Sequence, residues 1–333
     1  MKLLATGDLH IRGTSPRNRT DDYKEALKAK LREVFELARQ HMVEAILIPG
    51  DIFDRPEVST GVLLEFMAVF NETPVDIYTT PGNHDVYGYS LTTYERTSLR
   101  LLELLVPRLH VITDPTKYVF LAPGPGSFFI TFTPYSGAMD IDGYGYSPES
   151  GMEPAEWHQS ALKIHVAHGM LLDHVPPFDR YTLLADAKTT ADLVICGHYH
   201  NGFGIYDRAD GKVFLNPGAL GRIQATVQEI ERPIQVALIT LQDGIRAFTV
   251  ELLPIRCAAP GDQVLDRSKI EAAQRRQYAM DSFTTLIQTR TGERVLLNVD
   301  DIVQTIAAQE AAAPEIVTLA LAKINEQKQY VRG

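Results

Sequence analysis

The chain has few cysteines and no long apolar segment. Its 333 residues include only Cys196 and Cys257, and neither belongs to a C-x-x-C pair. Two isolated cysteines exclude a disulfide framework, so we predict a reducing, cytoplasmic setting. No apolar run approaches the roughly 20 residues that a membrane-spanning helix needs. The sequence enters a strand-like run almost at Met1, which predicts that no signal peptide is present.

Positive charge is scarce as well. The chain has 32 Lys and Arg against 42 Asp and Glu, a net charge of −10, which argues against a protein that coats nucleic acid with its whole surface. Screening over roughly 8 Å at physiological salt limits this argument, because local charge at a binding site matters more. The hydrophobic content of 45% supports a large buried core, and the length predicts one large domain with an appendage or two domains.

The first third of the chain alternates strand-like and helical segments. Short apolar runs at 2–6, 45–48 and 75–79 each end at a glycine-containing motif, and the stretches between them carry apolar residues at helical spacing. This order is typical of a parallel sheet covered by helices. After a third predicted helix at 92–105 short strands prevail, and we expect an α/β fold of two stacked sheets flanked by helices. The later predicted strands are 111–112, 118–121, 128–132, 162–167, 193–196, 204–206, 213–215, 234–241 and 245–252.

Two segments depart from this pattern. The stretch 139–157 is rich in glycine, tyrosine and acidic residues and contains no Lys or Arg; we interpret it as a solvated insertion, with a lid over the site as the alternative. From Cys257 onward the chain becomes helical, with predicted helices at 267–289, 300–308 and 314–327. We therefore predict two domains, 1–256 and 257–333, the second a small helical region that caps the first or binds a partner.

Five short motifs carry side chains that bind divalent metals. Each follows a predicted strand, and ligands of such sheets collect at the carboxyl ends of the strands. One motif alone is weak evidence, but all five in order indicate a two-metal phosphoesterase. The motifs are Gly7-Asp8-Leu9-His10, Gly50-Asp51-Ile52-Phe53-Asp54, Gly82-Asn83-His84-Asp85, His168-Gly169 and Gly197-His198-Tyr199-His200.

Seven residues of these motifs are candidate metal ligands. Their carboxylate, amide and imidazole groups together favour transition metals, so we predict two Mn ions, with Fe, Zn, Ni and Mg as alternatives. In a two-metal centre roughly 3.5–4 Å across, one carboxylate bridges the ions, and Asp51 is the natural bridge because it follows the central strand. We assign one ion to Asp8, His10, Asp51 and His200, and the other to Asp51, Asn83, His168 and His198.

The same motifs supply candidates for catalysis. His84 follows the ligand Asn83 on a tight turn, so its ring is free to protonate the leaving oxygen or to steady phosphoryl charge. We expect Asp85 to hold this ring in one tautomer, and Asp54 either to orient a ligand histidine or to act as a cap. His165 alternates with His168 along its strand, which predicts a core position.

Three further residues are candidates for binding the substrate. Arg12 and Arg222 are placed to grip phosphates beside the scissile bond, with ordinary solvated arginines as the alternative. Tyr87, like Tyr89, is a candidate for stacking on an unpaired base.

Together the five motifs resemble those of the calcineurin-like metallophosphoesterase family over about residues 1–252. The resemblance implies a four-layer αββα sandwich that hydrolyses phosphomonoesters or phosphodiesters at a two-metal centre. Three segments are most similar to the SbcD-type DNA repair nuclease subunits, including phage-borne relatives. These are Asp8-x-His10, the stretch 48–54 and Leu215-Asn216-Pro217-Gly218-Ala219-Leu220-Gly221-Arg222.

That closer resemblance implies a Mn-dependent DNA exonuclease and endonuclease that forms homodimers and binds an SbcC-type coiled-coil ATPase. The alternative is a small-molecule phosphodiesterase or phosphatase on the same fold, which the acidic charge favours. A non-catalytic binding scaffold is disfavoured, because the ligand set is complete and His84 accompanies it.

Overall fold

The computed structural model describes residues 1–121, 126–149, 160–242, 247–268 and 314–330, together with positions 154, 156, 157, 271, 275–278, 280, 282, 303, 304 and 307. The chain divides into two compact units, Met1–Arg267 and Ser268–Gly333. Our domain boundary between residues 256 and 257 stays a prediction.

The first sheet is built from the alternating segments of the N-terminal third and two late strands. Its order is β14-β13-β1-β2-β3-β4, in which β1 to β4 are parallel while β13 and β14 are antiparallel to their neighbours. Because parallel strands end at one edge, the first three motifs meet there. The strands are β1 (Lys2–Ala5), β2 (Ala45–Ile48), β3 (Asp76–Thr79), β4 (Leu109–Val111), β13 (Gln235–Leu241) and β14 (Phe248–Pro254).

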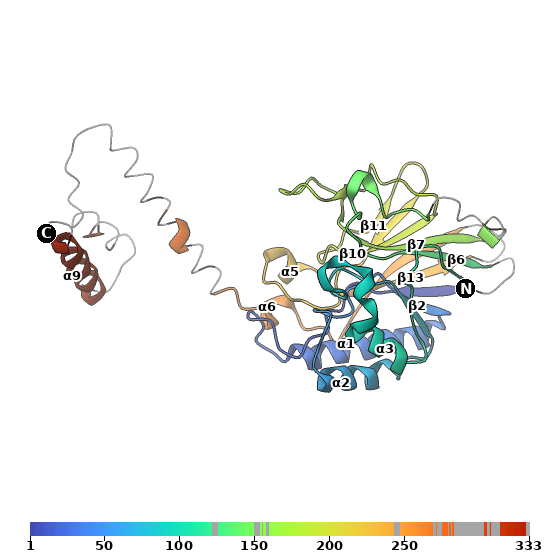
Figure 1. The fold of residues 1–333 in the computed structure, drawn as a ribbon, viewed down its shortest axis with the longest axis horizontal. Coiled ribbons are helices and arrows are strands. Elements are labelled where there is room, and N and C mark those ends of the chain that lie inside the picture. Colours follow the sequence, from blue (N-terminus) through green and yellow to red (C-terminus); the bar gives the residue numbers. More distant parts are fainter. Residues whose placement is uncertain are drawn as a thin grey trace. The chain divides into compact units, whose positions relative to one another are not determined.

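Three helices cover the outer face of this sheet, as Figure 1 shows: α1 (Tyr23–His41), α2 (Thr60–Phe70) and α3 (Ser98–Leu105). Asp22 caps the start of α1, because its side chain accepts a hydrogen bond from the Glu25 N–H. The predicted helix 92–105 is divided at Thr97, which ends the 3₁₀ helix η2 (Leu91–Arg96) and caps α3 through its hydroxyl. The buried faces of the three helices form one apolar cluster with the sheet.

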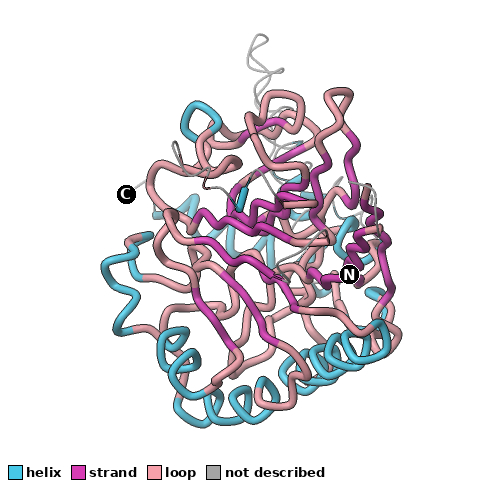
Figure 2. Tube along the Cα trace, turned by 90° about the vertical axis from the view of Figure 1, so that its right-hand side faces the viewer, coloured by secondary structure: helices cyan, strands magenta, loops and turns pink. Residues whose placement is uncertain are grey.

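The second sheet has the order β11-β12-β10-β7-β6-β5, and its four strands β12, β10, β7 and β6 are parallel. Apolar side chains of both sheets meet in a shared core that includes Leu3, Leu47, Ile130 and Ile195. The predicted fold of two stacked sheets with helices is confirmed (Figure 2). The strands are β5 (Tyr118–Leu121), β6 (Phe128–Thr133), β7 (Leu162–Gly169), β10 (Leu193–His198), β11 (Gly204–Asp207) and β12 (Val213–Asn216).

The segment after β6 packs on the outer face of the second sheet. Met139, Tyr146 and Trp157 are fully or almost fully buried there. Asp140 accepts hydrogen bonds from the Met170 N–H (2.8 Å) and the Thr182 hydroxyl (2.9 Å), which tie the segment to the chain beyond β7. Our interpretation of 139–157 as a solvated insertion is therefore wrong for Met139, Tyr146 and Trp157, which complete a core, whereas Ile141 and Tyr144 between them are exposed.

The remaining elements are short, apart from the last helix. They are η1 (Tyr87–Tyr89), η3 (Ile141–Gly143), β8 (Leu171–Leu172), β9 (Thr182–Leu183), α5 (Val227–Glu231), α6 (Gly261–Val264) and α9 (Pro314–Tyr330). The last helix begins at Pro314 as predicted, whereas most of the predicted helices 267–289 and 300–308 lies outside the described residues. No helix among the described residues is both long and apolar enough to cross a membrane.

Candidate metal centre

The candidate ligands lie at the carboxyl ends of the strands, with His168 and His198 in the last residues of β7 and β10 and the others in the turns that follow strands. Three of them have left-handed backbone conformations: His10 (φ 50°), Asp51 (φ 48°) and His198 (φ 75°). A non-glycine residue in this region costs about 1–3 kcal/mol, and such residues cluster at functional sites. The Asp51 carbonyl accepts both the Leu9 and the His10 N–H (3.0 Å each), so the first two motifs hold one another in place.

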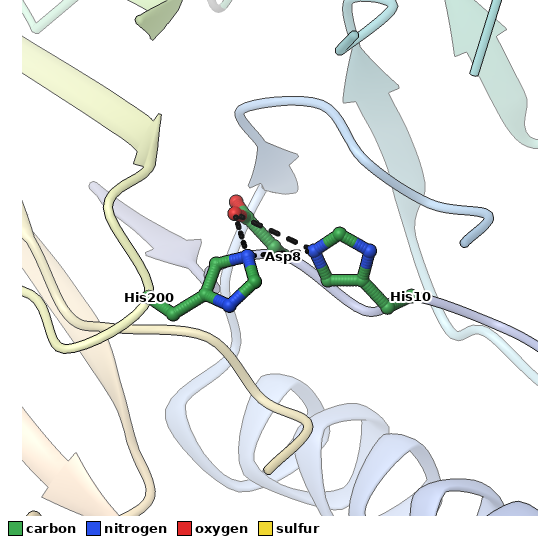
Figure 3. A group of neighbouring side chains, drawn as sticks. All are labelled: Asp8, His10 and His200. Carbon is green, nitrogen blue, oxygen red and sulfur yellow. Dashed lines mark hydrogen bonds and ion pairs between the residues drawn. The ribbon is translucent and has the colours of Figure 1, made fainter. Parts of the chain in front are cut away.

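Asp8, His10 and His200 form a first cluster, shown in Figure 3. The Nε2 atoms of the two histidines lie 2.8 Å apart. Oδ2 of Asp8 lies 3.6 Å from Nε2 of His200 and 4.0 Å from Nε2 of His10. The nitrogen and oxygen atoms that bind metals therefore point at one small volume.

Asp51, His168 and His198 form a second cluster, with the Asn83 side chain beside His168. Nδ1 of His168 donates to the Pro49 carbonyl (2.6 Å), so Nε2 of the neutral ring carries a lone pair. That lone pair faces two further acceptors, Oδ1 of Asn83 at 3.0 Å and Oδ2 of Asp51 at 3.2 Å. Three acceptors converging without a donor between them require a cation, either a proton or a metal ion. The donor set therefore fits a divalent metal.

Asp51 lies between the two clusters. Its Oδ2 atom is 3.6 Å from Nε2 of His10 and 3.2 Å from Nε2 of His168. Oδ2 of Asp51 and Oδ1 of Asp8 are buried and accept no hydrogen bond from any residue that the structure describes. Two orphaned carboxylate oxygens in a buried site are expected where cations bind.

Two glycines allow this crowding. A Cβ on Gly197 would lie 2.5 Å from Oδ1 of Asp8 and 2.6 Å from the Pro49 carbonyl oxygen, and a Cβ on Gly82 would clash with the Asp51 carboxylate. The glycines of these motifs are thus explained by the close approach of the loops.

Burial sets the protonation of the histidines. It lowers the pKa of His198 to about 3 and that of His200 to about 4, and it holds the pKa of His10 well below its usual value. These three imidazoles are neutral at pH 7 and offer their lone pairs as ligands. Burial also raises the pKa of Asp8 to about 7.

Asp51 and His168 behave as a charged pair. Burial opposes ionisation of both groups, but the attraction of His168 pulls the pKa of Asp51 well below its usual range. Asp51 in turn raises the pKa of His168 to about 9. In the chain by itself, a proton on His168 supplies the positive charge that a metal ion would bring to this position.

Comparison with known proteins agrees with this geometry. Residues 1–202, which include all seven candidate ligands, match the family described as calcineurin-like phosphoesterase. The chain belongs to this family. A comparison with curated protein sequences found no match.

Solved structures with a similar fold have low sequence identity to the chain. One is a dimetal phosphatase from Danio rerio, with 15% identity, a TM-score of 0.46 and coverage of 77% of this chain and 96% of that one. Another is an archaeal phosphodiesterase, with 16% identity, a TM-score of 0.36 and coverage of 76% of this chain and 100% of that one.

His84 is a partly exposed neighbour of the candidate ligands. Its Nδ1 atom contacts the Asp54 carbonyl oxygen at 2.8 Å, and its backbone N–H donates to Oδ1 of Asp51 at 2.9 Å. A carbonyl only accepts, so Nδ1 carries the hydrogen and Nε2 is left to exchange a proton. The ring centre lies 4.8 Å from that of His10, and one ring nitrogen of His84 lies close enough to ligand atoms of His10 and Asp51, within 4.8 Å, for all three to hold one ion. Its assignment as a non-ligand stays a prediction.

Asp85 has a different role from the predicted one. Its carboxylate is fully buried and accepts three backbone N–H groups, from Phe53 (2.9 Å), Gly82 (2.9 Å) and Ile52 (3.3 Å). It therefore joins the second motif to the third, while the backbone of Asp54 orients the His84 ring. The prediction that Asp85 fixes the tautomer of His84 is corrected accordingly.

Arg222 does not reach the substrate side. It is 4% exposed, and its guanidinium donates to the carbonyls of Glu229 (3.0 Å), Ala259 (2.7 Å) and Arg232 (2.7 Å). Burial lowers its pKa to about 10. The predicted phosphate contact is wrong, because these three nitrogen atoms donate to backbone carbonyls. Arg222 therefore ties segments of the chain together instead of binding a substrate.

Arg12 and Tyr87 are partly exposed but already have partners. Nη1 of Arg12 lies 3.3 Å from Oδ2 of Asp54, whose other carboxylate oxygen lies 3.8 Å from Nδ1 of His10. The Tyr87 hydroxyl donates to Glu57 (2.9 Å), and the Arg96 guanidinium lies 5.3 Å from the centre of its ring. Substrate contacts by Arg12 and Tyr87 stay predictions. His165 is buried between Thr131 and the Gly145 carbonyl, which confirms its core position.

Sequence reasoning missed Tyr135. Its ring centre lies 5.7 Å from that of His198 and 6.0 Å from that of His168, beside the second cluster. Tyr135 follows the end of β6, at the same edge as the metal-binding motifs. That position was the available signal, but no motif marked it.

Proposed function

We propose that the chain is a phosphodiester hydrolase with two divalent metal ions, and that it acts on DNA as a Mn-dependent nuclease of the SbcD type. The observation that supports the hydrolase is the convergence of acceptors around Nε2 of His168, which calls for a positive charge, together with the buried Asp8 Oδ1 and Asp51 Oδ2 atoms, which accept no hydrogen bond from any described residue. We assign one ion to Asp8, His10, Asp51 and His200, and the other to Asp51, Asn83, His168 and His198.

When bound, such paired ions lower the pKa of a water towards neutrality and stabilise the attacking and leaving oxygens of an in-line displacement. The chain's own contribution is to hold the ligands in place. The buried Asp85 carboxylate and the shared Asp51 carbonyl lock the loops of the first three motifs together, so the ligand atoms are placed before the substrate arrives.

His84 is the residue we assign to proton transfer. The Asp54 carbonyl fixes one hydrogen on Nδ1, so a second proton taken up by the ring resides on Nε2, and in that imidazolium form Nε2 protonates the leaving oxygen or donates a hydrogen bond to a phosphoryl oxygen. The Asp54 carboxylate also pairs with Arg12, while the Asp54 carbonyl binds Nδ1 of His84. The guanidinium of Arg12 therefore lies near the His84 ring, and Nε2 of His84 remains available to the substrate. A phosphate bound at His84 would therefore lie within the influence of the Arg12 charge.

The choice of DNA rests on the resemblance of residues 48–54 and 215–222 to the SbcD-type subunits. The second segment supports the site directly, since the Leu220 N–H donates to the Asp8 carbonyl (2.8 Å) and the Ala219 N–H to that of His200 (2.9 Å). The alternative remains a small-molecule phosphodiesterase or phosphatase, which the net charge of −10 favours.

The partner proteins, like the choice of DNA, are proposed on the resemblance. We propose a homodimer and an SbcC-type coiled-coil ATPase, both on the resemblance. Leu101, Leu104 and Leu105 are 44–62% exposed on α3, which is an unusual amount of apolar surface for one short helix and suits a dimer contact.

The test is a nuclease assay on single-stranded and end-bearing duplex DNA with Mn, Mg, Zn, Fe and Ni in turn. We expect Mn-dependent degradation, abolished by chelation and by Asp51→Asn. Hydrolysis of bis-aryl phosphates with none of any DNA, even with a partner ATPase present, would contradict the nuclease and leave the small-molecule enzyme.

A further inference from the structure

Three aromatic rings from distant parts of the chain form a continuous path from the metal centre to solvent. The path begins at the candidate ligand His198, whose ring centre lies 5.7 Å from that of Tyr135. The Tyr135 ring in turn lies 5.6 Å from the ring of Tyr89, at an angle of 58°. Tyr89 is 57% exposed, whereas Tyr135 is 8% exposed. The outer ring is thus open to a ligand while the inner one is fixed.

The inner ring is held from two sides. The Tyr135 N–H donates to the Pro81 carbonyl (2.9 Å), directly before the Gly82-Asn83 motif. Arg180 donates to the carbonyls of Gly137 (2.8 Å) and Met139 (2.9 Å), and its guanidinium carbon lies 5.9 Å from the Tyr135 ring centre. Tyr135 therefore has a fixed position relative to Asn83, and a positive charge lies beside its face.

The outer ring is presented by an unusual backbone. Tyr89 has a φ of 60°, a conformation that non-glycine residues rarely adopt. Thr93 braces the turn, because its hydroxyl accepts the Tyr87 N–H (2.9 Å) and donates to the Ser90 carbonyl (2.7 Å). A strained turn that holds an exposed tyrosine against a buried one is expected where the ring serves a ligand.

Tyr87 differs from Tyr89 in this respect. Its hydroxyl is bound to Glu57, and Arg96 lies over its ring. Tyr89, by contrast, is 57% exposed and packs on Tyr135 beside the metal centre, so its ring offers the open stacking surface.

We propose that Tyr89, supported by the buried Tyr135, forms an aromatic platform that binds an unpaired nucleobase next to the scissile phosphate. This inference rests on the proposed phosphodiester hydrolysis at the metal centre and specifies its substrate, a single-stranded or frayed nucleic acid. Every base has a flat π face, so a platform of this kind binds bases with little sequence preference. The positive charge of Arg180 at its edge suits the phosphate of the adjoining nucleotide.

The test uses dinucleotides, which have one scissile phosphate each. We would measure kcat/KM with Mn for thymidylyl-thymidine and for two analogues in which one or the other base is replaced by hydrogen. The proteins are the unaltered chain, Tyr89→Ala, Tyr89→Phe and Tyr118→Ala. The last is a matched control, since Tyr118 is 40% exposed and stacks on the buried Phe129 ring at 4.4 Å, on the edge strand β5.

We expect Tyr89→Ala to lower kcat/KM for the full dinucleotide roughly tenfold to a hundredfold, the range of one base–aromatic stack. For the analogue that lacks the stacked base the loss should vanish, and Tyr89→Phe and Tyr118→Ala should match the unaltered protein on every substrate. An equal loss on all three substrates, or no loss on any, would overturn the platform.

A second readout separates the platform from the proposed hydrolysis. Single-stranded DNA containing 2-aminopurine loses fluorescence when that base stacks on an aromatic ring, and the measurement needs no cleavage. If the unaltered protein hydrolyses no nucleic acid, the proposed function fails. The platform then stands if the protein quenches 2-aminopurine and Tyr89→Ala does not, and it fails if the two proteins quench equally or neither does.

Discussion

Replacing Asp85 by asparagine separates two roles for a buried carboxylate beside His84. The side chains have the same shape, so the change leaves no cavity. Oδ2 of Asp85 accepts the Gly82 N–H (2.9 Å) and the Ile52 N–H (3.3 Å), and Oδ1 accepts the Phe53 N–H (2.9 Å). An amide oxygen in the Oδ2 position preserves two of these bonds, and the NH₂ group then faces the Phe53 N–H, donor against donor.

The expected magnitude follows from that geometry. A hydrogen bond to a charged group contributes about 1.5–3 kcal/mol, and a buried donor left without a partner costs about 1–3 kcal/mol. The lost hydrogen bond and the unpartnered donor both concern the Phe53 N–H, so the two energies are partly the same energy and do not add in full. We therefore expect Asp85→Asn to lower the free energy of unfolding by about 2–4 kcal/mol. Its loops also place the ligand Asp51, so Mn affinity should fall about 10–100-fold, as it does when groups supporting a ligand are removed.

Urea unfolding at pH 7 with chelator present measures the stability, and metal analysis after dialysis measures the Mn content. His84→Gln is the matched control: it lies in the same motif, and its ring has one hydrogen bond, to the Asp54 carbonyl, which a glutamine amide can replace. The reasoning would be refuted if Asp85→Asn unfolded like the unaltered chain and retained its metal while losing activity. That result would restore the role of Asp85 as the group that orients His84.

The remaining predictions concern the other buried or partly buried groups. His84→Gln should lower kcat by about 10²–10⁴-fold, the range of general acid catalysis, with unchanged metal content; a fall in metal content would make it a ligand. Arg222→Met should lower the free energy of unfolding by about 2–4 kcal/mol, because three carbonyls lose their donors, and kcat/KM of the folded protein should stay unchanged. Arg12→Met should have the opposite effect, with unchanged stability and a lower kcat/KM. Burial lowers the pKa of Lys30 to about 7 from a usual value of 10.5, so the unfolded chain binds more protons in this window and stability rises with pH from about 7 to 10.5. In urea titrations at pH 7 and 9, the unaltered protein should gain about 2 kcal/mol relative to Lys30→Met, and parallel pH profiles would contradict the shift.

The strands and their motifs could be predicted because the cause is local. Apolar runs such as 45–48 form strands through their own side chains, and the parallel order then brings Asp51 and Asn83 to one edge without further information. The grouping of His198 and His200 with different clusters also follows from the turn after Gly197, whose missing side chain lets the chain pass close to Asp8.

The errors concern groups whose partners come from elsewhere in the sequence. The positive charge of Arg222 suggests a phosphate contact, but its guanidinium donates to three carbonyls that lie up to 37 residues away in the sequence. Asp85 stands beside His84 in sequence, yet its hydrogen bonds reach back to Phe53. The acidic composition of 139–157 conceals Met139, which is fully buried because the outer face of the second sheet needs a cover. Such roles depend on tertiary contacts that no local pattern encodes.

The way the loops are joined explains why the site needs so many separated motifs. Each left-handed ligand is held by a group from another segment: the Asp51 carbonyl binds the His10 N–H, the His198 N–H donates to Oδ2 of Asp8, and the Tyr23 hydroxyl bonds to the His10 carbonyl. No single loop could maintain its strained conformation alone, since each costs about 1–3 kcal/mol. The strain is therefore supported jointly by the two sheets, and the ligands are positioned by the protein before any metal binds. It follows that substitutions in this network should weaken metal binding and stability together, whereas substitutions at His84 should alter turnover, and those at Tyr89 substrate binding, with metal content and stability unchanged.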